Sequence, residues 1–137
     1  MIEEDKKLIL LKDLSGRIPY SLRMHELEPL NNIQINLYLY GVTSEGSVMC
    51  NSEEGGVVCS SVDAFKPYLF PMSSMTDEQR EELNNALIQL ELKAINNEIE
   101  HYKVSDFEVD FYNKHHFDYR GLIDKGLAID AKNLNIY

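Results

Sequence analysis

The stretch AFKPYLFPMSSMT constrains the fold more than any other part of this sequence. Pro67 and Pro71 fix their own φ angles and disfavour helical backbone at the residues before them, so residues 63–75 must run extended. Thr76 then forms a capping box with Gln79, a pattern that begins helices. The chain therefore divides into a first part of strands and turns and a second part of helices, which predicts an α+β fold.

The extended stretch is too apolar for a free linker. Its large apolar side chains are Phe65, Tyr68, Leu69, Phe70, Met72 and Met75. We expect this segment to lie across the sheet as a strap that closes the core. The alternative is an exposed apolar patch that binds a partner.

Strand patterns fill the chain before the strap. The segment IQINLYLYG alternates apolar and polar side chains, which places Ile33, Ile35, Leu37 and Leu39 on one face of a strand. We interpret the earlier run KLILL as a strand too. Short connections then predict an antiparallel sheet over about residues 7–62, either open or curled into a small barrel.

Two cysteines lie in one predicted hairpin of this sheet. In SVMCNSEEGGVVCS a tight turn near Glu54 and Gly55 would place Cys50 and Cys59 opposite each other. Neither cysteine has a basic neighbour in the sequence, so we interpret both as small buried hydrophobic residues rather than redox groups.

A long helix follows the capping box. Its apolar pattern persists from Thr76 to about residue 102, although Asn96 and Asn97 are able to bend or break it. Two apolar stripes lie side by side on this helix: Leu83, Leu87, Leu90 and Ala94 form one, and Ile88, Leu92, Ile95 and Ile99 form the other. Such a wide face predicts burial on more than one side, either within the chain or against a second copy.

The next segment, VSDFEVDFYNK, fits two patterns. Its apolar residues alternate as in a strand, but Phe107 and Phe111 also share a helix face. A second capping box from Ser105 to Glu108 favours a helix. We therefore predict short helices and turns over residues 105–126, with glycines ending them.

Composition predicts one domain and limits the partners. The chain has 137 residues, 44% of them hydrophobic, and a formal net charge of −10. This length fits a single core. The negative charge disfavours direct binding to nucleic acid, and the sequence contains no run of about 20 apolar residues that would cross a membrane. The first residues lack the basic start and the long apolar run of a signal peptide, so we expect a cytoplasmic protein with reduced thiols.

The segment NKHHFDYRGLIDKG holds the candidate site residues His115, His116, Asp118 and Arg120. Adjacent residues point in different directions on a helix or a strand, so the two histidines do not readily bind one metal together. His115 and Asp118 are the weak metal candidates, but a zinc site needs at least three protein ligands. We therefore expect no metal and no cofactor, and we interpret Asp118 and Arg120 as an ion pair or a lock on the backbone.

Other catalytic patterns are missing from the sequence. No GxSxG elbow is present, and the serine pairs at 60–61 and 73–74 have no neighbouring base. The segments EEGG and YRGL lack the glycine spacing of a phosphate-binding loop. Because these patterns are missing, the sequence does not identify the chain as an enzyme and favours a non-enzymatic role.

Two motifs, KPYLFPMSSMT at 66–76 and HHFDYRGLIDKGLAIDA at 115–131, resemble a family of small uncharacterised proteins from gut anaerobes. The genes of that family often lie in prophage or mobile-element neighbourhoods. Phe70 stands where the family motif more often has a basic residue, and FYN at 111–113 replaces its tryptophan-leucine-asparagine. The family has no established activity, so the resemblance implies only a context: a cytoplasmic accessory protein of phage origin.

Three functional hypotheses follow. The first is a non-enzymatic accessory protein that binds another protein or a second copy of itself. The second is a small metal-dependent or acid–base enzyme that uses His115, His116 and Asp118. The third is an acidic mimic of DNA, whose carboxylates occupy a nucleic-acid-binding protein.

Overall fold

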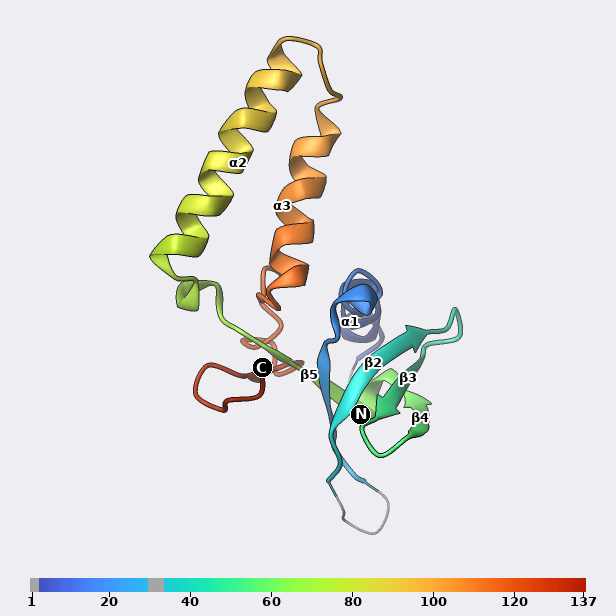
Figure 1. Ribbon diagram of the computed structural model, residues 1–137. Coiled ribbons are helices and arrows are strands. Elements are labelled where there is room, and N and C mark those ends of the chain that lie inside the picture. Colours follow the sequence, from blue (N-terminus) through green and yellow to red (C-terminus); the bar gives the residue numbers. More distant parts are fainter. Residues whose placement is uncertain (1–2, 30–33) are drawn as a thin grey trace.

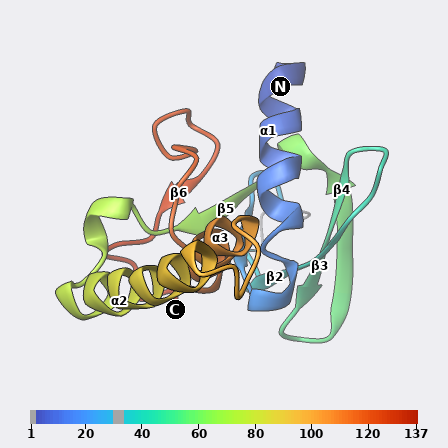
Figure 2. The same cartoon turned by 90° about the horizontal axis from the view of Figure 1, so that it is seen from above.

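The computed structural model describes residues 3–29 and 34–137, and within these residues three α-helices accompany one six-stranded sheet (Figures 1 and 2). The elements in chain order are α1 (Glu4–Ser15), β1 (Arg23–Glu26), β2 (Leu37–Val42), β3 (Ser47–Ser52), β4 (Gly56–Ser61), β5 (Phe65–Leu69), α2 (Asp77–Ile95), α3 (Tyr102–Lys114) and β6 (Ile129–Asp130). Short 3₁₀ turns lie at Ile18–Tyr20, Val62–Ala64 and Met72–Ser74. The predicted α+β class is confirmed.

The sheet is open rather than closed into a barrel. Its strand order is β4-β3-β2-β1-β5-β6, and every pair is antiparallel except β5 with β6. Strands β4 and β6 are the two edges and do not pair with each other. The barrel alternative is therefore wrong.

The first predicted strand is a helix. Residues of the KLILL run belong to α1, and the sheet begins at Arg23 rather than near residue 7. Leu10 and Leu14 lie four residues apart on the buried face of α1, which packs against β2. A short apolar run has no period that separates a strand from a buried helix, and here burial of the i, i+4 pair decides for the helix.

Strands β2, β3 and β4 form a meander. Leu37 and Leu39 are buried as predicted, Ile35 packs against the same core, and Ile33 lies outside the described residues. The predicted pairing of the cysteines is wrong, because Cys50 lies opposite Val58.

The turn between β3 and β4 contains three residues, 53–55, and Gly55 has φ +84°. With this turn the two strands pair one residue away from the register that would place the cysteines opposite each other. Cys50 is buried and Cys59 is exposed, so only the first fits the predicted burial, and both thiols are free. Burial raises the pKa of the Cys50 thiol to about 12, which keeps it protonated.

The predicted strap is extended only from Phe65 to Pro71, because Met72–Ser74 form a 3₁₀ turn, and it does not cross the sheet. Its first part is β5, which pairs with β1 on one side and with β6 on the other. Phe65, Pro67 and Leu69 alternate into the core. The segment therefore closes the core as one of the sheet's own strands.

Helices α2 and α3 form an antiparallel hairpin that projects away from the sheet and α1 (Figure 1). The capping box is confirmed: Gln79 N donates to Thr76 Oγ1 at 3.1 Å, and Thr76 N donates to Gln79 Oε1 at 3.0 Å. The predicted extension of this helix to residue 102 is wrong, because α2 ends at Ile95 and Asn97 has φ +60°. The helix favoured for the VSDFEVDFYNK segment is confirmed, but it already begins at Tyr102, so Ser105 does not cap it.

Two hydrophobic clusters stabilise these parts. The larger lies between the sheet and α1 and is centred on Leu14, Leu22, Phe65 and Leu69. The smaller fills the base of the hairpin with Met75, Leu83, Phe111 and Phe117. No helix in the described ranges is long and apolar enough to cross a membrane.

Candidate functional site

The two histidines lie where α3 ends, in a Schellman motif. Phe117 N donates to Tyr112 O at 2.8 Å and His116 N donates to Asn113 O at 3.2 Å. His116 occupies the left-handed position, with φ +62°, where glycine is usual. The backbone reverses direction at this residue, and so the two imidazoles separate.

Each imidazole packs against a different aromatic ring. The His115 ring lies 4.5 Å from the Phe111 ring, measured between centroids. The His116 ring stacks on Tyr137 at 3.9 Å with an angle of 15° between their planes. The structure therefore does not bring the two histidines together as a ligand pair.

Asp118 is engaged with the backbone. Its Oδ1 accepts a hydrogen bond from Leu122 N at 2.7 Å, and its Oδ2 accepts one from Ile123 N at 2.9 Å. The interpretation of Asp118 as a backbone lock agrees with these bonds. Arg120 does not pair with it, because the Arg120 Nε lies 3.3 Å from Asp13 Oδ1 instead.

The partner of Arg120 belongs to a buried ion pair that sequence reasoning missed. Asp13 and Arg17 are fully buried, and Arg17 donates to both carboxylate oxygens of Asp13, at 2.8 and 3.2 Å. Arg17 Nη2 also donates to Phe117 O at 2.7 Å. The pair thus fixes the HHFDYR segment to the end of α1. The i, i+4 spacing of Asp13 and Arg17 was its only signal in the sequence.

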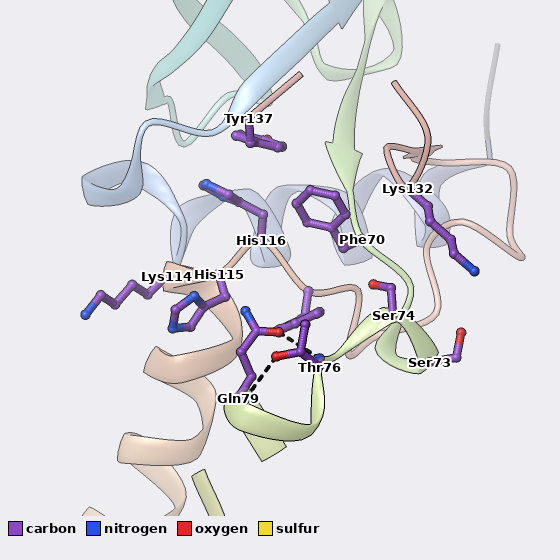
Figure 3. Close-up of a pocket in the computed structure, with 11 residues that line it drawn as sticks. Phe70, Ser73, Ser74, Thr76, Gln79, Lys114, His115, His116, Lys132 and Tyr137 are labelled. Atoms are coloured by element: carbon purple, nitrogen blue, oxygen red, sulfur yellow. Dashed lines mark hydrogen bonds between the residues drawn. The ribbon is translucent and has the colours of Figure 1, made fainter. Parts of the chain in front are cut away.

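A pocket of about 710 Å³ lies where the hairpin meets the rest of the chain (Figure 3). The 3₁₀ turn before α2, the first turn of α2, the end of α3 and the C-terminal segment all contribute to its wall. Three aromatic rings supply much of its apolar surface: Phe70, Phe117 and Tyr137. Both histidines line it, whereas Asp118 and Arg120 do not.

The polar wall of the pocket comes from the start of α2. The capping box fixes the orientation of the Gln79 amide, because its Oε1 accepts from Thr76 N. The Gln79 Nε2 group then has no hydrogen-bond partner among the described residues and lies on the pocket side of the helix (Figure 3). Ser74 Oγ donates to Pro71 O at 2.6 Å, and the Ser73 side chain is exposed.

The charged side chains that line the pocket are positive, whereas the net charge of the whole chain is negative. Lys114 and Lys132 lie on opposite sides of its rim (Figure 3). No aspartate or glutamate is present among the described residues that line it. By contrast, a neighbouring pocket of about 470 Å³ is lined by Asp118, Asp124 and Asp130 and by no basic side chain that the structure describes there.

His116 is neutral at physiological pH. Burial lowers the pKa of its imidazole to about 4, with a further contribution from the positive charge of Arg17. Its Nδ1 atom is buried and has no hydrogen-bond partner in the part of the chain that the structure describes. A neutral imidazole offers one donor and one acceptor, so this ring retains unused hydrogen-bonding capacity beside the pocket.

The arrangement does not form a metal centre. Within residues 3–29 and 34–137, no group of three or more histidine, cysteine, aspartate or glutamate side chains could hold a metal ion. His115 and Asp118 are separated by the reversal at His116, and the Asp118 oxygens already accept two amide hydrogen bonds. Comparison with protein-family models, with curated proteins and with solved structures finds no match to this chain.

Proposed function

We propose that this protein is a non-enzymatic accessory protein that binds a protein partner through the α2 face of its helical hairpin. One observation carries the proposal. Ile88, Leu92 and Ile95 lie on one face of α2 and are 53%, 51% and 70% exposed. The apolar stripe that was expected to be buried is thus uncovered within the single chain.

The charge around this stripe indicates what covers it. Between Asp77 and Lys114 the chain carries ten acidic and four basic side chains. A second copy would bring the same excess of negative charge, so the interface would be repulsive. The complementary partner is a helix with an apolar stripe and flanking lysines or arginines.

A pocket near the tip of the hairpin offers an anchoring point next to the stripe. It has a volume of about 380 Å³ and is lined by residues of both helices, including Glu91, Ile95, His101 and Val104. An apolar side chain of the partner fits between Ile95 and Val104, and the Glu91 carboxylate would attract a basic neighbour of that side chain.

The expected affinity is modest. Covering the exposed halves of three aliphatic side chains contributes about 1 kcal/mol each, or about 3 kcal/mol in all. Association consumes at least that much free energy through lost motion, so the charges must supply much of the remainder. The complex should therefore weaken as salt increases.

The enzyme hypothesis receives less support from the same geometry. His115 and His116 diverge, and Asp118 is hydrogen-bonded to two backbone amides. These residues lack the mutual hydrogen bonds that link a base to the group that orients it. The motif resemblance adds a prophage or mobile-element setting to the proposal, and the partner would then be a phage or host protein.

Two helical peptides with the same leucine stripe, one flanked by lysines and one by glutamates, test the proposal. Each is titrated against the full chain with methyl-labelled isoleucine and leucine, followed by NMR. We expect the basic peptide to shift the signals of Ile88, Leu92 and Ile95 and the acidic peptide to leave them unchanged. Equal binding of the two peptides, or shifts elsewhere in the molecule, would contradict the proposal.

Matched variants sharpen this experiment. Leu92→Lys should weaken binding of the basic peptide by about tenfold or more, whereas Leu134→Lys, at another leucine that is about half exposed, should not. Light scattering at high concentration tests the second-copy alternative. A dimer that Leu92→Lys abolishes and Leu134→Lys retains would overturn the basic partner and assign the stripe to self-association.

A further inference from the structure

The pocket at the base of the hairpin has a chemistry that the docking stripe does not use. The chain as a whole has 23 acidic and 13 basic side chains, yet the described lining of this pocket combines two lysines with no aspartate or glutamate. A cavity lined by two lysines and no acidic side chain repels anions less than the acidic surfaces of the chain do, such as the neighbouring pocket with Asp118, Asp124 and Asp130. Its electrostatics therefore favour a negatively charged ligand.

Hydrogen-bond donors face this cavity in a fixed arrangement. The Gln79 Nε2 group has two N–H donors without partners among the described residues, and the capping box holds the amide in that orientation. The Thr76 hydroxyl accepts from Gln79 N and keeps its own hydrogen free to donate. These two donors lie side by side on one wall (Figure 3).

The two lysines extend the positive charge to both sides of the opening. Lys114 is the last residue of α3, and Lys132 lies in the C-terminal segment, so the two come from opposite walls (Figure 3). Both side chains are exposed and flexible, and either ammonium group is able to turn towards a bound anion. A phosphate between the walls would then meet lysine charge and the Gln79 and Thr76 donors.

Aromatic rings supply the remaining surface. Phe70 lines the centre of the pocket, beside the stacked pair of His116 and Tyr137. Flat rings offer a stacking surface to another flat ring, and small-molecule sites combine such apolar surface with precisely placed polar groups. The volume of about 710 Å³ is far more than inorganic phosphate fills and suits an organic ligand.

We propose that this pocket binds a mononucleotide, with the phosphate held by Gln79, Thr76 and the two lysines and the base against Phe70. Neither the phosphate nor the base alone satisfies both parts of the pocket. This site is separate from the α2 stripe, and its occupancy does not require the hairpin partner.

Calorimetric titration of the full chain tests the ligand class. The probes are the four ribonucleoside monophosphates, the corresponding nucleosides and inorganic phosphate. We expect at least one mononucleotide to bind with a dissociation constant below about 1 mM and at least about tenfold more tightly than its nucleoside or phosphate. Equal affinity for a nucleotide and its nucleoside, or no nucleotide binding in this range, overturns the proposal.

Gln79→Glu is the decisive variant. Glutamate at this position keeps the capping box, so the helix is retained, but it replaces the two N–H donors with a negative charge. Binding should weaken by about tenfold or more, whereas Gln89→Glu, an equal change of charge at an exposed position of the same helix, should change it less than about twofold. Equal effects of the two variants would mean that the nucleotide lies elsewhere and would overturn the proposal.

The lysines provide a second and independent comparison. The double variant Lys114→Met and Lys132→Met should weaken binding by about tenfold, and Lys103→Met, at an exposed lysine near the start of α3, should not. Leu92→Lys should leave nucleotide binding unchanged, which distinguishes failure of this site from failure of the docking stripe. Nucleotide binding that survives the double lysine variant contradicts the assignment.

Discussion

Replacement of Arg17 by methionine should destabilise the protein strongly. Methionine keeps much of the arginine stem but removes the guanidinium, which makes two hydrogen bonds to Asp13 and one to Phe117 O. The Asp13 carboxylate would remain fully buried, with only Arg120 at 3.3 Å to offset its charge. Breaking a buried ion pair from one side costs about 3–5 kcal/mol, because the remaining charge has lost its partner.

That loss is a large fraction of the free energy of unfolding expected for a small domain, about 5–15 kcal/mol. It corresponds to a drop in melting temperature of about 10 °C or more for a chain of this size. Urea unfolding followed by circular dichroism measures the change, and an unaltered slope with denaturant would show that the compactness of the two states is unchanged. Arg80→Met, at an exposed arginine, is the control and should change the free energy of unfolding by less than about 0.5 kcal/mol.

The double variant Asp13→Leu with Arg17→Met separates charge from packing. Since no unpaired carboxylate remains, it should recover most of the stability lost in the single variant, and the unpaired Phe117 carbonyl leaves a deficit of about 1–2 kcal/mol. An Arg17→Met protein within about 1 kcal/mol of the wild type would refute the reasoning. So would a double variant that is no more stable than the single one.

Two further predictions concern the segment that this ion pair anchors. His116 has a folded-state pKa of about 4 against an ordinary 6.5, so the unfolded chain binds its proton first, and stability falls as pH drops from about 6.5 towards 4. His116→Asn removes the imidazole, and asparagine tolerates the left-handed backbone. Urea unfolding at pH 7.5 and at pH 4.5 measures the free energy of unfolding of both proteins, and the difference between wild type and variant should shrink at the lower pH by on the order of 1–2 kcal/mol, after allowance for partial solvent screening. A difference that stays the same at both pH values would contradict the prediction. Asp118→Ala should lower the free energy of unfolding by about 1–3 kcal/mol, because two backbone amides lose their acceptor. Asp124→Ala, at an exposed aspartate, is the control. Equal effects of the two variants would show that the Asp118 hydrogen bonds contribute nothing.

Local patterns predicted the parts of the fold that local interactions decide. The capping box at Thr76 and Gln79 needs only four consecutive residues, and it forms as expected. The alternation around Leu37 and Leu39 likewise reports one buried face of a strand. The helix was predicted to reach residue 102, but it breaks near Asn97, one of the two asparagines that were noted as able to break it and a residue type that tolerates positive φ.

The predictions that failed depended on contacts between distant segments. Whether KLILL becomes a strand or a helix depends on the sheet face that covers it, which no neighbouring residue reveals. The place of β5 between β1 and β6 is set by strands some 40 and 60 residues away in sequence. For the candidate site, the sequence located the histidines but not the pocket, because the donors at Thr76 and Gln79 approach them only in the folded chain.

The chain passes twice between the sheet and the hairpin, and the two passages lie side by side. Phe70 N donates to His116 O and Asp118 N donates to Phe70 O, both at 2.8 Å. These bonds join the two passages into a narrow connection between the sheet and the hairpin, which we call the neck. The nucleotide pocket opens at this neck, with Thr76 and Gln79 on the hairpin side and Lys132 and Tyr137 on the sheet side. A molecule that touches both sides binds most tightly at one angle between them. Occupancy and the orientation of the hairpin would then be linked by a single coupling free energy, equal in both directions.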